Sequence, residues 1–213
     1  QHALESYLRQ VEESVESAIG ASAGRGERQA IAEKLLEPDF QKLPDLAVHA
    51  REVANVAQRF ARYLELPAHQ IETIRIAALV HDVGMRLIDY DRLYRKEELT
   101  AEEKRAVAEH PVVGAALVEP LLGAEVAYAV LRHHERFDGK GYPSKIGGQQ
   151  IPLAARIIQI ADTWTTMTSS HTYKKEPARE EEAIEQLRDA AGTQLDSTLT
   201  IKFIAALPQI VNR

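Results

Sequence analysis

Histidines in apolar surroundings are the residues of this chain best suited to chemistry. The sequence has 213 residues and eight histidines, and five of these lie on or beside apolar helical faces: His49, His81, His110, His133 and His134. A neutral imidazole in an apolar core must find a partner, and one metal ion satisfies several imidazoles together. A single buried histidine is usually an ordinary core residue, but five of them near helix ends favour a metal centre.

Two aspartates strengthen the prediction of a metal centre. Asp82 directly follows His81, and Asp162 ends the largely apolar run 157–161. A buried carboxylate without a counter-charge is costly, so Asp162 needs a cation. The chain has no cysteine, which excludes disulfides and thiolate zinc sites. Imidazole with carboxylate suits iron, manganese, zinc or nickel better than calcium or magnesium.

Helices are the elements that must position these side chains. Apolar residues recur at helical spacing nearly everywhere, and no segment alternates with the period of two typical of a half-buried strand. The sequence therefore predicts an all-α fold with one irregular Gly-rich stretch, between His134 and Pro152. Proline stops, a capping box at Thr100–Glu103 and a cap at Asp196 divide the helices roughly into 27–38, 46–64, 68–81, 101–111, 112–122, 124–131, 152–169, 178–190 and a last helix after Asp196.

The first 26 residues are expected to form a separate segment ahead of a main domain that spans 27–213. Leu4, Leu8, Val11 and Val15 recur at steps of four and three, which is the stripe of a coiled coil. This helix packs on the domain or, alternatively, is a coiled-coil linker that carries a signal from an upstream domain and makes a homodimer. The chain begins with Gln1 rather than Met, so we expect it to be part of a longer protein.

Composition and charge restrict the kinds of molecule that the chain can bind. Lys and Arg number 26 against 32 Asp and Glu, a net charge of −6. This balance argues against broad binding of a nucleic-acid backbone but allows a small anionic ligand to be held locally. The most apolar stretch, Ile74–Val80, is far shorter than the ~20 residues of a membrane span. Without a signal peptide or cysteine, the expected location is cytoplasmic.

Five motifs in order resemble the HD-GYP family, a branch of the HD phosphohydrolases. The resemblance covers about 45–207 and is carried mainly by the long run from His133 to Pro143, which ends in Gly-Tyr-Pro. The other four motifs are His81-Asp82, the run His110–Gly114, the run Ala161–Trp164 and the run Ala191–Asp196.

The resemblance implies an HD-domain helical bundle that hydrolyses cyclic di-GMP to linear pGpG, and onward to GMP in some members. It implies two metal ions, with iron or manganese favoured and zinc or nickel as alternatives. By position, Asp82 would bridge the metals and hold a metal-bound hydroxide that attacks phosphorus. The implied ligands are His49, His81, Asp82, His110, His133, His134 and Asp162.

A third metal is the alternative to this two-metal arrangement. In some family members a glutamate four residues before the first histidine holds it, and here that position is Asp45. Its carboxylate is one methylene shorter, and a cap for a helix starting near Leu46 is the other interpretation.

Around the implied metals, the substrate-binding positions depart from the family pattern. Met85 stands where a lysine is usual, Thr165 where a second aspartate is usual, and His171 where an arginine is usual, while Lys174 matches. Fewer cations and carboxylates weaken binding of a dianion and proton transfer. Two alternatives to the enzyme therefore remain: a receptor that binds a cyclic dinucleotide or a partner with little turnover, and a hydrolase of another cyclic dinucleotide.

The Gly-Tyr-Pro loop has two interpretations. Gly139 and Gly141 allow tight turns, which is a purely structural role. The family resemblance implies in addition that the loop, with Tyr142 and Pro143, takes part in substrate access and in contacts with diguanylate cyclase domains.

Overall fold

The computed structural model describes residues 26–42, 44–87, 99–169 and 177–211. These residues form eight α-helices and two short 3₁₀ helices, and they contain no β-strand, only an isolated bridge between Ala191 and Leu195. The prediction of an all-α fold is confirmed. The heptad segment and residues His171 and Lys174 lie outside the described residues.

The helices follow one another with short connections. Their bounds are α2 (Glu27–Lys42), α3 (Pro44–Tyr63), α4 (Ala68–Val80), η1 (Val83–Leu87), α6 (Ala101–Leu122), α7 (Ala124–Arg132), η2 (Gly148–Gln150), α8 (Leu153–Thr168), α9 (Glu180–Ala190) and α10 (Ser197–Ile210). Two predicted caps are confirmed. Thr100 and Glu103 form the capping box of α6, and the Asp196 side chain accepts a hydrogen bond from the Leu199 backbone at the start of α10.

Two predicted helix boundaries at prolines are wrong. α2 continues through Pro38 to Lys42, and α6 continues through Pro111 to Leu122. Proline costs a helix one hydrogen bond to the carbonyl four residues earlier. At Pro38 the proline is on the surface, where water can satisfy that carbonyl. At Pro111 the freed carbonyl belongs to Val107 and accepts a hydrogen bond from His110 instead.

The start of α3 also differs from the prediction. The helix begins at Pro44, not near Leu46, so Asp45 lies in its first turn rather than at the cap. Proline is favoured at the first position of a helix because its missing N–H would have no partner there. The carboxylate of Asp45 in the first turn still complements the positive end of the helix dipole.

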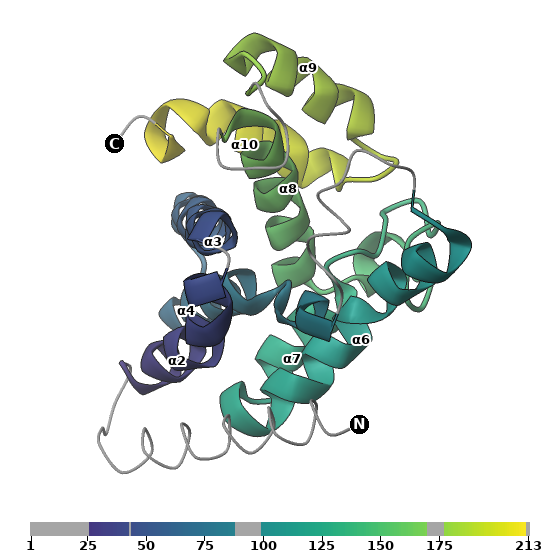
Figure 1. The fold of residues 1–213 in the computed structure, drawn as a ribbon. Coiled ribbons are helices and arrows are strands. Elements are labelled where there is room, and N and C mark those ends of the chain that lie inside the picture. The colour runs from purple at the N-terminus through teal and green to yellow at the C-terminus, as the bar shows by residue number, and fades with distance from the viewer. Residues whose placement is uncertain (1–25, 43, 88–98, 170–176, 212–213) are drawn as a thin grey trace.

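α8 runs through the middle of the molecule and contacts α3, α4, α7, α9 and α10 (Figure 1). α9 and α10 lie together at one end of α8, with α6 and α7 toward the other. The core between α3, α8 and α10 contains Phe60, whose ring centroid lies 5.1 Å from that of Phe203. α4 is buried along its second half, from Thr73 to Val80. None of the described helices is long and apolar enough to cross a membrane.

Candidate metal centre

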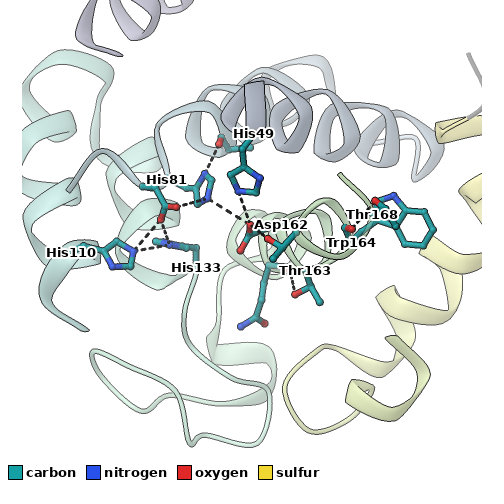
Figure 2. Close-up of polar contacts among 12 residues, drawn as sticks. His49, His81, His110, His133, Asp162, Thr163, Trp164 and Thr168 are labelled. Carbon is teal, nitrogen blue, oxygen red and sulfur yellow. Dashed lines mark hydrogen bonds and ion pairs between the residues drawn. The ribbon is translucent and has the colours of Figure 1, made fainter. Parts of the chain in front are cut away.

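Seven histidine and aspartate side chains from five parts of the chain meet in the interior. His49 lies on α3, Asp162 on α8 and His110 on α6. His81 and Asp82 occupy the junction between α4 and η1, and His133 and His134 directly follow α7. Figure 2 shows the labelled histidines and Asp162 pointing toward a common centre. His110 was expected near a helix end but lies within α6, because that helix continues past it.

Two groups of potential ligands share Asp82. Asp82 with His110, His133 and His134 forms one, and Asp82 with His49 and His81 forms the other; in each, one ligand atom per residue lies within 4.8 Å of the others. The Oδ1 atom of Asp82 lies 3.2 Å from His110 Nε2 and 3.6 Å from His133 Nε2. Its Oδ2 atom lies 3.3 Å from His81 Nε2. One carboxylate thus presents an oxygen to each group, as a bridging ligand must.

Asp162 closes the second group from the side of α8. Its Oδ1 atom lies 3.1 Å from His49 Nε2 and 4.0 Å from His81 Nε2. α3 and α8 therefore meet at the pair His49–Asp162 (Figure 2).

Backbone carbonyls orient three of the histidine rings in the same way. The Nδ1 atoms of His81, His110 and His133 lie 2.7, 2.6 and 2.6 Å from the carbonyl oxygens of Ala78, Val107 and Val130, three residues earlier in each case. A carbonyl only accepts, so Nδ1 carries the proton and Nε2 keeps its lone pair for a cation. At His81 and His133 these carbonyls belong to the last turn of a helix, where they have no helical partner.

The burial of these nitrogen atoms fits a cation. His81 and His133 are each 1% exposed, and His110 is 2% exposed. His81 Nε2 makes no hydrogen bond of good geometry although it is buried, and His110 Nε2 lies 3.2 Å from His133 Nε2, nitrogen facing nitrogen. Buried imidazole nitrogens that converge without donors between them are satisfied by a metal ion.

The electrostatics of the metal-free cluster keep both carboxylates ionised. Burial alone would raise the pKa of Asp82, but without a metal the charge of protonated His81 outweighs burial and holds that pKa well below its usual range. Burial likewise opposes ionisation of Asp162, while the hydrogen bond from His49 lowers its pKa to about 2. Burial would lower the pKa of His81, but Asp82 outweighs it and raises the pKa to about 9. Burial lowers the pKa of His133 and, more strongly, of His134.

A close backbone approach brings Asp82 to His110. η1 packs on α6 at Gly84, where an added Cβ would overlap the His110 carbonyl and lie 2.6 Å from the Gly114 nitrogen. Only glycine allows this contact. The glycines in the motifs around His81 and His110 therefore join two ligand-bearing elements.

The Gly-Tyr-Pro loop folds back over His134. The Tyr142 backbone N–H donates to the His134 carbonyl at 3.2 Å, and the two rings stack with centroids 4.9 Å apart. At Gly141 an added Cβ would overlap the Arg136 nitrogen and lie 2.5 Å from the same carbonyl. The run Ala191–Asp196 holds the loop from the other side, because its carbonyls at Thr193 and Gln194 accept from Asp138 and Phe137.

Sequence reasoning gave no role to Glu135, which directly follows His133 and His134 and is fully buried. Its Oε1 atom accepts from the Ser144 backbone at 2.6 Å and lies 3.3 Å from Arg132 Nη1. The Gln159 side chain donates to the Glu135 carbonyl at 2.9 Å. The signal for this role was a charged residue directly after two candidate ligands and before a glycine-rich stretch.

The remaining predicted residues lie outside the two groups. Asp45 is exposed in the first turn of α3. Met85 lies in η1, and its backbone N–H donates to the Asp82 carbonyl at 2.9 Å. Thr165 is buried on α8, one turn beyond Asp162. Among the described residues, Asp45 belongs to neither group of potential ligands, so no group for a third ion forms around it.

Comparison with known proteins identifies the family of the chain. A family model described as HD domain matches residues 34–199. The cyclic di-GMP phosphodiesterase response regulator RpfG of Xanthomonas campestris is 35% identical over 58% of this chain and 33% of its own length. A 3'3'-cGAMP-specific phosphodiesterase of Vibrio cholerae, numbered 2, is 28% identical over 73% of this chain and 30% of its own length. The chain thus spans about a third of these relatives.

A solved structure agrees in fold. An HDG"Y"P protein from Bdellovibrio bacteriovorus superimposes with a TM-score of 0.62 at 16% identity, over 96% of this chain and 64% of that one.

Proposed function

The chain belongs to the HD domain family, and we propose that it is a metal-dependent phosphodiesterase that opens cyclic di-GMP to linear pGpG. The observation that carries the proposal is the pair of ligand groups that share Asp82. Two cations held a short distance apart suit the displacement at a phosphodiester. Cyclic di-GMP is the substrate named for one of the relatives. Hydrolysis of the second bond, giving GMP, is an extension of the same proposal.

The ligands divide naturally between two ions. His49, His81 and Asp162 with one oxygen of Asp82 would hold the first, and His110, His133 and His134 with the other oxygen would hold the second. Iron or manganese is the proposed metal, because the set is imidazole and carboxylate without thiolate; zinc and nickel accept the same donors. When bound, such ions neutralise phosphate charge and lower the pKa of water.

The chain's own residues prepare this chemistry. The three carbonyl bonds to Nδ1 fix the direction of the Nε2 atoms before any ligand arrives. Five of the seven ligands are imidazoles, which are neutral when they hold a metal and so spare an anionic substrate the repulsion that a site made of carboxylates would exert. Tyr142, stacked on His134, covers one side of the group formed by Asp82, His110, His133 and His134.

Two other functions compete with hydrolysis of cyclic di-GMP. Met85 and Thr165 remove a cation and a carboxylate from the family pattern, which favours a receptor that binds a cyclic dinucleotide but turns it over poorly. The relative that is specific for 3'3'-cGAMP favours a hydrolase of a mixed dinucleotide. Further proposals are a homodimer through the N-terminal helix, contact with diguanylate cyclase domains through Gly139–Pro143, and a cytoplasmic location supported by the cysteine-free composition.

Substitution of Met85 separates enzyme from receptor. Met85→Lys adds a cation three residues after Asp82, where the family carries a lysine, and one well-placed donor stabilises a developing charge by roughly 3–4 kcal/mol. We expect kcat for cyclic di-GMP to rise at least tenfold, with Arg86→Lys as a control that keeps the charge of the neighbouring residue. Binding without turnover in both the parent and Met85→Lys would establish the receptor instead.

A further inference from the structure

A cavity with polar and apolar walls lies about one helical turn from the candidate metal centre. It has a volume of about 370 Å³ and opens between α3, α8 and the end of α10. This volume falls within the range of roughly 300–1,000 Å³ typical of small-molecule sites. Its walls combine the polar side chains of Glu52, Asn55 and Arg59 with the apolar Val56 and Ile210.

On both α3 and α8, a residue that lines the cavity follows a candidate metal ligand by three positions. Glu52 follows His49 by three residues on α3, and Thr165 follows Asp162 by three residues on α8. Three residues of helix rise about 4.5 Å. His49 and Asp162 touch each other, and Figure 2 shows Trp164 and Thr168, which line the cavity, farther along α8. The cavity therefore lies about one helical turn from the metal centre, within reach of the next group of a ligand whose phosphate is at that centre.

Two buried polar atoms in the cavity wall have no partner. Glu52 Oε2 and Thr165 Oγ1 are each buried without a hydrogen bond, and Thr165 as a residue is 3% exposed. An unsatisfied buried polar group costs about 1–3 kcal/mol. Both residues line the cavity, and their unpaired oxygens are suited to a ligand that donates hydrogen bonds.

The charge of Glu52 decides which part of a nucleotide belongs here. A carboxylate repels phosphate, so the cavity suits the neutral base and not a second phosphate. Arg59 lies two turns beyond Glu52 on the same face of α3, with Nη1 donating to the Ile210 carbonyl at 2.6 Å. The guanidinium carries further N–H donors. The cavity thus offers acceptors at one end and donors at the other.

We infer that this cavity is a guanine-binding subsite and that Glu52 selects guanine over adenine; the inference rests on the proposed function. The N1–H and N2–H groups of guanine can both donate to one carboxylate, while its O6 and N7 accept from an arginine. Adenine presents an unprotonated N1 to the same carboxylate and an amino group in place of O6. A buried site built for one pattern of donors rejects a base that leaves its groups unpaired.

Glu52→Gln tests the inference, because glutamine has the same shape but pairs with the donor and acceptor edge of adenine. We would measure kcat/KM for cyclic di-GMP and for cyclic di-AMP with metal-loaded protein, and the binding of GMP and AMP by calorimetry. The parent should prefer the guanine ligand in both measurements. The ratio of guanine to adenine should fall roughly ten- to hundredfold in Glu52→Gln, the discrimination of one bidentate contact.

Glu72→Gln is the matched control, because it removes the same charge from a half-buried position on α4 outside the cavity and both ligand groups. Loss of any carboxylate can strengthen the binding of every anionic ligand, and the ratio of guanine to adenine ligand within each variant cancels this general effect. If the parent cleaves cyclic di-GMP but its preference is absent, or is the same in Glu52→Gln as in Glu72→Gln, the inference is wrong and the proposed function stands. A parent that binds and cleaves neither cyclic dinucleotide overturns the proposed function, and the guanine subsite with it.

Discussion

The carbonyl of Val107 links His110 to the proline that follows it. In an unbroken helix this oxygen would accept from the N–H of residue 111, but proline has none. The oxygen accepts instead from His110 Nδ1 at 2.6 Å, so Nε2 is directed toward Asp82. His81 and His133 reach the same geometry at helix ends, where carbonyls are free without proline. The His-Pro pair thus frees a carbonyl oxygen for the histidine in mid-helix, as the last turn of a helix does for His81 and His133.

Replacing Pro111 tests this role of a single residue. Pro111→Ala restores an N–H that competes for the Val107 carbonyl, and loss of such an orienting partner typically lowers metal affinity by about 10–100-fold. We expect weaker metal binding in a titration followed by calorimetry, with the helical circular dichroism signal preserved. Pro120→Ala is the control, because Pro120 is the other proline of α6 and is exposed. Equal metal affinity in the two variants would remove the proposed role of Pro111.

At the scale of elements, η1 and α6 bring their ligands together only because their backbones touch. Gly84→Ala would force the Cβ into the His110 carbonyl and the Gly114 nitrogen, and overpacking of this kind costs about 1–3 kcal/mol. We expect denaturant unfolding to report a loss of that size in the metal-free protein and metal titration to report weaker binding, because Asp82 is pushed away from His110.

The control for that element contact is Gly26→Ala, where an added Cβ meets no atom within 4 Å. Should Gly84→Ala match Gly26→Ala in both measurements, the contact between η1 and α6 does not position the ligands.

Most helices could be predicted from spacing because each buries one face. α3, for example, buries Val53, Ala57 and Phe60 at steps of four and three. The boundaries at Pro38 and Pro111 could not, because a proline can be accommodated within a helix where water or another donor satisfies the carbonyl that it frees. The cavity beside Glu52 could not be predicted from the sequence either. The spacing of apolar residues indicates which face of α3 is apolar, but it does not indicate that the polar edge of that helix meets Thr165 of α8.

For the candidate site, the sequence indicated the residue types and the resemblance indicated their order. The convergence of His49 with Asp162, more than a hundred positions apart, follows from the packing of α3 on α8, which no local pattern encodes. Met85 and Thr165 are described here, but His171 and Lys174 lie outside the described residues, so their proposed contacts with substrate remain predictions.

At the scale of the whole molecule, the acidic chain must attract an anion locally. With a net charge of −6, the overall field opposes a cyclic dinucleotide, so the attraction has to come from bound cations and from nearby basic side chains. The segment 1–26 also concerns the whole molecule, because its heptad stripe predicts a partner helix.

Removal of residues 1–20 tests the predicted dimer. Leu4, Leu8, Val11 and Val15 would pair with the same residues of a second copy. We expect light scattering to report twice the chain mass for the full chain and the single mass after deletion. An identical mass state with and without the segment would mean that the helix packs on its own domain.

Metal-dependent hydrolysis is tested most directly by the turnover of cyclic di-GMP by protein purified without oxygen and loaded with Fe(II) or Mn(II). We expect about two ions per chain by elemental analysis and conversion of cyclic di-GMP to pGpG. Asp82→Asn should lose most of the metal and the turnover, while Asp189→Asn, an exposed position on α9, should keep both. A folded parent without metal, or equal turnover in parent and Asp82→Asn, would show that the chain is not a metal-dependent phosphodiesterase acting through Asp82.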